Sequence, residues 1–120
     1  MDLKISHNIQ NIALDNGALN NERENDKIDK KRVWWVEAES VVGFINAYQH
    51  SGEKKFLESA RSVWEYIKAE MIDKREGSEW YSEVSYDHKP HDWKEIVGPW
   101  KCPYHNGRMC MEVINRGVDF

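Results

Sequence analysis

Apolar residues recur at helical spacing along much of the chain, most clearly between Glu53 and Met71. There they follow the i, i+3, i+4, i+7 rule and comprise Phe56, Leu57, Ala60, Val63, Trp64, Ile67 and Met71. This spacing predicts an amphipathic helix. Its opposite face is charged and offers no chemistry, so we expect an outer, structural helix with Trp64 in the core.

A second helical pattern runs from Val33 to about His50, where Ser51-Gly52 ends it. Its broad apolar face contains Trp34, Trp35, Ala38, Val41, Val42 and Ile45. Glu39 falls at the margin of this face, one turn after Trp35. A carboxylate at such a margin is either solvated or partly buried and paired, and the pattern leaves both interpretations open.

The pattern also predicts helices at both ends of the chain. The first starts near the N-terminus and ends at Asp15-Asn16-Gly17, and its apolar residues are Ile5, Ile9, Ile12 and Ala13. The last runs from about Tyr104 to Asn115, with Arg108 facing Glu112 at i, i+4 and Gly117 as the stop. Its apolar side comprises Met109, Cys110, Val113 and Ile114.

The connections between these helices differ in length. Gly17 to Arg32 is polar and turn-rich, which predicts a loop or a small hairpin. Gly77 to Pro103 begins with alternation at Trp80 to Tyr86, which predicts a strand or hairpin followed by a long loop. The helices and their connections then form two repeated helix pairs, all-α in class. Paired-helix repeats need neighbours to cover their apolar faces, so we expect part of a larger structure.

Composition narrows the classes of function. The net charge of −4 gives no basic surface for nucleic acid. The first residues lack the pattern of a signal peptide and no apolar run could span a membrane, so the expected location is the cytoplasm. Two cysteines are too few for a disulfide framework, and we expect no disulfide. The spacing of Cys102, His105 and Cys110 lacks the further ligands of a zinc site, so no metal is expected.

The six tryptophans are unusually many for 120 residues, and the stretch Trp34-Trp35-Val36-Glu37-Ala38-Glu39 places two of them beside two carboxylates. Indole faces stack on the C–H faces of a pyranose, and carboxylates accept hydrogen bonds from its hydroxyls. Tryptophan pairs are also common in cores, so this stretch alone does not decide between a sugar site and packing.

His105 lies in the first turn of the last predicted helix, within Gly98-Pro99-Trp100-Lys101-Cys102-Pro103-Tyr104-His105-Asn106-Gly107-Arg108. A helix N-terminus and a nearby guanidinium favour the neutral imidazole, the form that accepts a proton. A surface or capping role is the alternative for a single histidine. The chain contains no phosphate-binding glycine loop, no Gly-x-Ser-x-Gly and no His-Glu-x-x-His, which argues against phosphoryl transfer and against serine or zinc hydrolysis.

The Trp34–Glu39 stretch and the segment around His105, together with the spacing between them, closely resemble the C-terminal portion of cellobiose 2-epimerases in the N-acylglucosamine 2-epimerase superfamily. The likeness extends from about residue 12 to residue 116. It implies an (α/α)6 barrel, of which residues 1–120 form about the last third of a single catalytic domain, with no second domain. It implies neither metal nor nucleotide cofactor.

The resemblance also implies an activity and roles for particular residues. Such enzymes convert the reducing-end glucose of a β-1,4-linked disaccharide into mannose. The substrate would be cellobiose, with lactose or mannobiose as further candidates. His105 corresponds to a general acid/base that moves the C2 proton through a cis-enediolate. Trp34 and Trp35 would contact the sugar, Glu39 would bind substrate and hold the histidine network, and Arg108 would lie in the same pocket.

The chain departs from this pattern in two ways. Glu37 stands where the family has Gln, which adds charge that we expect beside the pocket. The partner histidines of the family lie upstream of residue 1, and proton transfer on both faces of C2 needs more than His105. We therefore expect the isolated chain to be inactive. Two alternatives remain: a non-catalytic helical module that binds sugar, and an aldose–ketose isomerase of the same superfamily.

Overall fold

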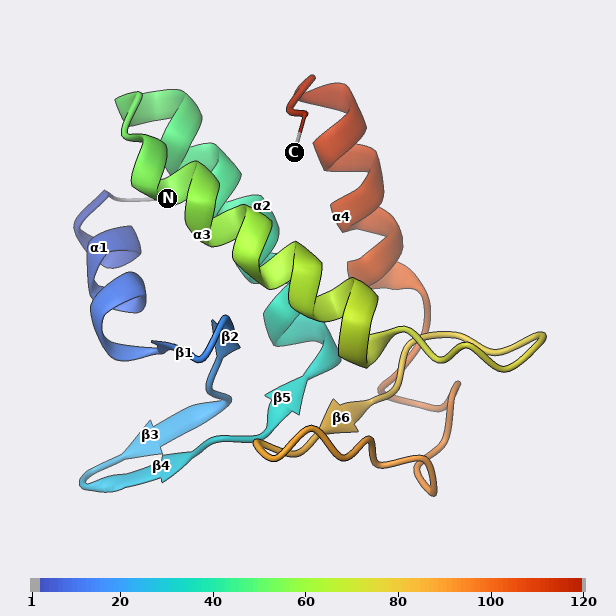
Figure 1. The fold of residues 1–120 in the computed structure, drawn as a ribbon. Coiled ribbons are helices and arrows are strands. Elements are labelled where there is room, and N and C mark those ends of the chain that lie inside the picture. The colour runs from blue at the N-terminus through green and yellow to red at the C-terminus, as the bar shows by residue number, and fades with distance from the viewer. Residues whose placement is uncertain (1–2, 120) are drawn as a thin grey trace.

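The computed structural model describes residues 3–119, in which four α-helices dominate (Figure 1). The helices are α1 (Leu3–Ile12), α2 (Trp34–Ser51), α3 (Lys54–Tyr66) and α4 (Tyr104–Asn115). A π-helical segment, η1 (Ile67–Met71), continues α3. Short antiparallel pairs of strands connect them: β1 (Leu14–Asp15) with β2 (Ala18–Leu19), β3 (Glu22–Glu24) with β4 (Lys27–Asp29), and β5 (Arg32–Val33) with β6 (Glu83–Val84). The predicted all-α class is confirmed, with small hairpins between helices.

The segment between α1 and α2 forms two hairpins, and a hairpin was one of the two alternatives predicted for it. Gly17 was predicted to end the first helix, which was partly wrong because α1 already ends at Ile12. Asn16 (φ 52°) and Gly17 (φ 87°) instead form the tight turn between β1 and β2. Two consecutive residues at positive φ suit the right-handed twist of a two-residue hairpin, and an Asn-Gly pair adopts them at little cost.

Helices α2 and α3 lie side by side and antiparallel, and they form the centre of the molecule (Figure 1). Gly52 joins them in the left-handed conformation (φ 73°), and its N–H donates to the Tyr48 carbonyl at 2.7 Å. The core between them includes Trp34, Ala38, Val41, Ile45, Phe56, Ala60, Val63, Ile67 and Met71. Trp35 departs from the predicted apolar face, because 46% of its surface is exposed. Trp64 is only partly buried at the edge of the core.

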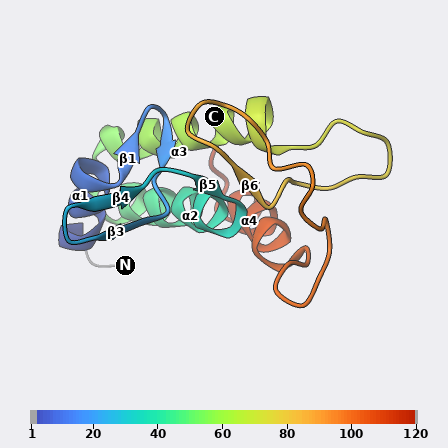
Figure 2. The same cartoon turned by 90° about the horizontal axis from the view of Figure 1, so that it is seen from below.

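Strand β6 begins a local hairpin, in which Val84 bridges Pro90 and the His91 N–H donates to the Glu83 carbonyl at 2.9 Å. The strand also pairs with β5 at the start of α2, where Arg32 faces Val84 and Val33 faces Glu83. The Trp34 N–H, the first of α2, donates to the Ser82 carbonyl at 3.0 Å. The predicted long loop follows β6 and leads to α4. This pairing therefore brings the loop and the N-terminal ends of α2 and α4 to the same end of the molecule (Figure 2).

Helix α4 packs against α2 on the side away from α1 (Figure 1). Its bounds agree with the prediction, but its apolar side is covered unevenly: Met109 is buried, whereas Ile114 is 76% exposed. An open groove follows this side, lined by Val41, Trp64, Met109, Cys110, Val113, Ile114, Val118 and Asp119. The helices of residues 3–119 form an open arc without a closed ring (Figure 1). Within the same residues, no helix combines the length and apolar composition needed to cross a bilayer.

Candidate functional site

A carboxylate of α2 joins two cationic or basic side chains of α4. Glu39 Oε1 lies 2.8 Å from His105 Nδ1, and Glu39 Oε2 accepts a hydrogen bond of 2.8 Å from Arg108 Nη1. Each side chain is about one-third exposed: 34% for Glu39, 33% for His105 and 38% for Arg108. Glu39 is therefore partly buried and paired, which was one of the two interpretations of its position on the helix. The predicted pair between Arg108 and Glu112 was wrong, because Glu112 instead binds Arg116 at 2.9 Å.

Helical periodicity explains why these side chains meet. Trp35 and Glu39 are separated by one turn of α2, and His105 and Arg108 by one turn of α4, so each pair occupies one face of its helix. The two faces oppose each other where the helices begin. The structure thus brings together two motifs whose contacting residues lie 66 and 69 positions apart in the sequence.

The contact with Glu39 determines which nitrogen of His105 is available. An ionised carboxylate can only accept hydrogen bonds, so Nδ1 must carry the hydrogen. In the neutral imidazole this leaves a lone pair on Nε2. The arrangement has the form of a base oriented by a carboxylate, with Nε2 able to take a proton from a substrate.

Three aromatic rings surround the imidazole. The ring centroids of Trp34 and Tyr104 lie 5.3 and 5.0 Å from that of His105, both in edge-to-face geometry, and the Trp35 centroid lies at 5.9 Å. Trp34 is only 4% exposed, so it supports the imidazole from the core, while Trp35 presents an open face. Tyr104 was not among the predicted site residues, although its position directly before His105 at the start of the helix was a usable signal.

A hollow of about 630 Å³ adjoins the tryptophans at the start of α2. Its far wall is the long loop, which contributes the exposed indoles of Trp93 and Trp100. Charged side chains alternate with these rings, and the complete lining is Val33, Trp34, Trp35, Ser82, Glu83, Trp93, Lys94, Glu95, Trp100 and Lys101. Indoles interleaved with hydrogen-bonding groups suit a carbohydrate. The sequence prediction included only the α2 side of this hollow.

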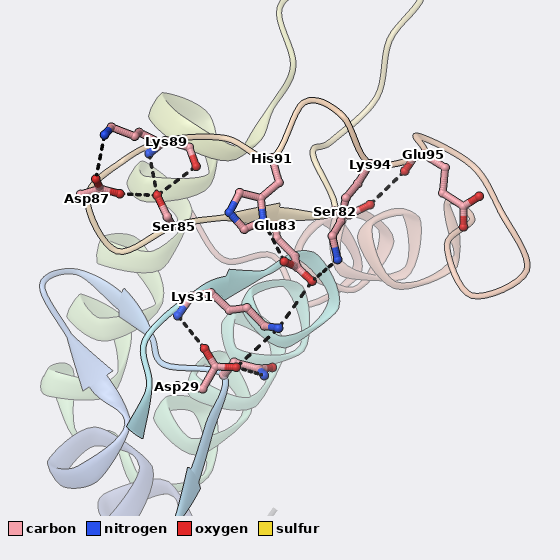
Figure 3. Close-up of polar contacts among 11 residues, drawn as sticks. Asp29, Lys31, Ser82, Glu83, Ser85, Asp87, Lys89, His91, Lys94 and Glu95 are labelled. Carbon is pink, nitrogen blue, oxygen red and sulfur yellow. Dashed lines mark hydrogen bonds and ion pairs between the residues drawn. The ribbon is translucent and has the colours of Figure 1, made fainter. Parts of the chain in front are cut away.

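Glu83 fastens the long loop to the strands (Figure 3). Its carboxylate contacts His91 Nδ1 and Lys94 Nζ at 2.9 Å each, and Lys31 Nζ lies 3.7 Å away. Burial alone would raise the pKa of this carboxyl, but the hydrogen bonds from Lys94 and His91 hold the pKa below its usual value. Lys31 also pairs with Asp29 of β4 at 3.5 Å, which links the loop to the second hairpin.

Glu37 lies away from this site, which corrects the expectation that its charge stands beside the pocket. Its side chain is fully buried on the α3 side of α2, and Oε1 accepts a hydrogen bond of 2.7 Å from the Leu19 N–H. Burial raises the pKa of this carboxyl to about 8, although the Leu19 hydrogen bond and Arg32 act in the opposite direction. Glu37 is therefore a buried acid that remains largely protonated at neutral pH.

The chain is similar to known sugar epimerases over nearly its whole length. The profile of the family described as N-acylglucosamine 2-epimerase (GlcNAc 2-epimerase) matches residues 7–107. The chain is 80% identical to the cellobiose 2-epimerase of Ruminococcus albus over 119 residues, which are 99% of this chain and 31% of that protein. It is 47% identical to the cellobiose 2-epimerase of Dictyoglomus turgidum over 116 residues, which are 97% of this chain and 30% of that protein.

A solved structure agrees with these relatives. The crystal structure of a sugar epimerase from a ruminal bacterium superposes with a TM-score of 0.96 at 79% identity, covering 98% of this chain and 30% of that one. The chain thus spans about a third of the length of its relatives. Those relatives are (α/α)6 barrels, of which the arc of helices described above is one part. By profile, sequence and fold, this chain belongs to the N-acylglucosamine 2-epimerase family.

Proposed function

We propose that these residues form one wall of the active site of an epimerase that interconverts glucose and mannose at the reducing end of cellobiose-type β-1,4-disaccharides. The observation that carries the proposal is the contact between Glu39 and Nδ1 of His105, which leaves Nε2 of a neutral imidazole free beside the exposed face of Trp35. The names of the relatives, which are cellobiose 2-epimerases, support the choice of substrate.

The proposed reaction is a proton transfer at C2 of the open-chain sugar. His105 Nε2 removes the C2 proton, and the electrons of the C–H bond form the double bond of a cis-enediolate, with negative charge on the former carbonyl oxygen. Return of a proton to the opposite face of C2 gives the epimer. Arg108 lies on the same carboxylate as His105, so its guanidinium can stabilise the oxyanion.

The aromatic residues have different proposed roles. Trp35 offers an exposed indole face for stacking on the sugar, whereas the buried Trp34 packs edge-to-face with the imidazole and restrains its orientation. Glu39 orients His105 and can accept a hydrogen bond from a sugar hydroxyl. The loop indoles of Trp93 and Trp100 extend the surface available to a disaccharide.

Epimerisation requires a second proton-transfer group on the other face of C2, and ring opening as well. His88 and His91 are engaged elsewhere, with Glu70 at 3.6 Å from His88 and Glu83 at 2.9 Å from His91, so neither is assigned this role. We therefore propose that the 120-residue chain is inactive by itself. Incubation of the isolated chain with cellobiose tests this, and formation of glucosylmannose would contradict it.

A chimera tests the activity directly. The chain replaces the matching segment of the R. albus cellobiose 2-epimerase, to which it is 80% identical, so the surfaces between the two parts should fit. We expect this chimera to convert cellobiose to glucosylmannose, and His105→Asn to reduce kcat by about 10³-fold or more. A fructose-type product would instead assign an aldose–ketose isomerase. Sugar binding without turnover would assign a non-catalytic module.

A further inference from the structure

The carboxylate of Glu79 receives side chains from two other segments. Glu79 precedes Trp80, which pairs with Ile72 in an isolated bridge, so its backbone is fixed near the end of η1. Lys101 Nζ donates to Glu79 Oε2, and Asn106 Nδ2 donates to Glu79 Oε1. Glu79 thus joins the end of the long loop to the first turn of α4.

Lys101 depends on this carboxylate, because its side chain is only 4% exposed. Nζ also donates to the Ile96 carbonyl at 2.9 Å and lies 5.0 Å from the ring centroid of Trp34. Of these partners, Glu79 is the one that carries negative charge. A buried ammonium that loses its counter-charge is strongly unfavourable, so removal of Glu79 would displace Lys101 from its place against Trp34.

Two routes connect Glu79 with His105. The first passes through Lys101 to the ring of Trp34, whose centroid is 5.3 Å from that of the imidazole. The second passes through Asn106, the residue that follows His105 in the first turn of α4. Both routes end on His105, one on its ring and one on its backbone.

We propose that Glu79 is a positioning residue for His105, which acts by holding Lys101 against Trp34 and Asn106 in the first turn of α4. This inference rests on the proposed function of His105 as the proton-transfer group. Reacting atoms must be placed within a fraction of an ångström, and a shift of about 1 Å can reduce the rate about 100-fold. Glu79 therefore affects the chemical step through Lys101 and Asn106, the side chains that donate to its carboxylate.

Glu83 provides a contrast on the same segment. It holds His91 and Lys94 in the first part of the loop (Figure 3), and these contacts do not reach α4. Because Lys94 lines the tryptophan-rich hollow, loss of Glu83 should alter how substrate binds. Two carboxylates four residues apart thus hold different parts of one loop, Glu83 beside the hollow and Glu79 beside the imidazole.

The chimera with the R. albus enzyme separates these roles. In Glu79→Gln the side chain keeps its shape but loses its charge, and we expect kcat to fall about 10- to 100-fold with little change in KM. In Glu83→Gln we expect KM to rise more than kcat falls. Glu112→Gln is the matched control, since it breaks an ion pair with Arg116 farther along α4 and should leave kcat unchanged.

Two further variants keep the test informative if Glu79→Gln folds poorly. Asn106→Ala preserves the pair between Glu79 and Lys101, and we expect about a 10-fold loss of kcat from the second route alone. In the double variant Glu79→Gln with Asn106→Asp, the new amide can donate to the new carboxylate while its oxygen accepts from Lys101, so the cluster keeps its negative charge. We expect this exchange to recover most of the lost kcat.

The measurements are kcat, KM and the pH–rate profile, each normalised to the folded fraction from circular dichroism. For Glu79→Gln we expect kcat per folded molecule to be lower across the whole profile, because a displaced imidazole is less effective at every pH. A fall in thermal stability with unchanged kcat per folded molecule would overturn the inference and leave Glu79 a structural residue. Absence of epimerase activity in the unsubstituted chimera would instead contradict the proposed function itself.

Discussion

Glu37 and Glu39 are the same amino acid on the same helix, yet they occupy opposite environments. Glu37 is fully buried, with the Leu19 N–H on one oxygen, and its other oxygen has no hydrogen-bond partner among residues 3–119. Glu39 is 34% exposed and has a partner on each oxygen, His105 and Arg108. The first faces the packed half of the molecule between α2 and α3, and the second faces the open half beside α4.

Helix geometry creates this difference. Successive residues turn by about 100°, so two positions separate these side chains by about 200° around the axis. Glu37 shares the inner face with Trp34 and Val41, which are both buried. A protonated carboxyl there resembles a glutamine amide, because it combines an acceptor with a donor. Acidic residues two positions apart on a helix therefore cannot be assigned to one site from their proximity in sequence.

The largest expected effect comes from Glu39→Gln in the chimera. A glutamine amide can donate to Nδ1 of His105, which moves the imidazole hydrogen to Nε2 and removes the base. We expect kcat to fall about 10³-fold, with the melting temperature nearly unchanged. Glu37→Gln is the matched substitution two residues away and should retain kcat. Equal losses of kcat in both variants would eliminate the distinction between the two carboxylates.

Truncation of the buried carboxylate should mainly affect stability. Glu37→Ala removes the hydrogen bond to the Leu19 N–H and leaves a cavity in the core. We expect unfolding of the chimera in urea to require about 2 to 4 kcal/mol less free energy, with kcat per folded molecule retained. The conservative Glu37→Gln variant should recover most of this stability. Full stability of Glu37→Ala would show that the carboxyl is not part of the core.

The buried acid also predicts a pH dependence. Its pKa rises from 4.5 in the unfolded reference to about 8 in the folded chain, so the folded state binds the proton more tightly. Its stabilising contribution is complete below about pH 4.5 and declines as the pH rises toward 8, by at most about 1.4 kcal/mol per pH unit. We expect a total decline of about 1 to 3 kcal/mol across this range. Denaturation series at several pH values should show this decline in the free energy of unfolding for the unsubstituted chimera and not for its Glu37→Gln variant.

The smallest effect is expected for an exposed ion pair on α4. Glu112 binds Arg116 at 2.9 Å, with exposed fractions of 34% and 29%. Solvent screens such a pair, so Glu112→Ala should lower the free energy of unfolding by less than about 1 kcal/mol. The exposure of this pair is close to that of Glu39 and its partners. A loss several times larger would indicate that exposed ion pairs on these helices contribute to stability. The effect of Glu39 substitutions on kcat would then have to be separated from an effect on stability.

Local patterns predicted the helices well. The bounds of α4 are those expected, and α2 begins within one residue of Val33, because apolar periodicity and terminal glycines act over a few residues. The same helical wheel could have placed Glu37 on the buried face, since it lies one turn before Val41. The expectation was wrong because it rested on the charge of Glu37 and not on the helix face that this residue occupies.

Contacts between distant segments could not be predicted in this way. Alternation at Trp80 to Tyr86 predicted a strand where β6 lies, but strands of two residues are too short for their sequence to show that β6 pairs with β5. Arg108 illustrates the same limit: the i, i+4 rule favoured Glu112, but packing of α4 on α2 offered Glu39. Glu79 and Lys101 were missed because an isolated acid and an isolated lysine in loops resemble solvated residues until burial is known.

The separation of 66 residues between Glu39 and His105 has a consequence for how the chain folds. Contacts between neighbours along the chain, such as those of α2 with α3, close short loops and form early, whereas contacts that close long loops lose more chain entropy and form late. The imidazole would then meet its carboxylate only after the long loop has docked. During refolding, the quenching of Trp34 fluorescence by His105 reports completion of the pocket. We expect this signal to change more slowly than the helical signal recovers, because the pocket is the last part of the chain to form.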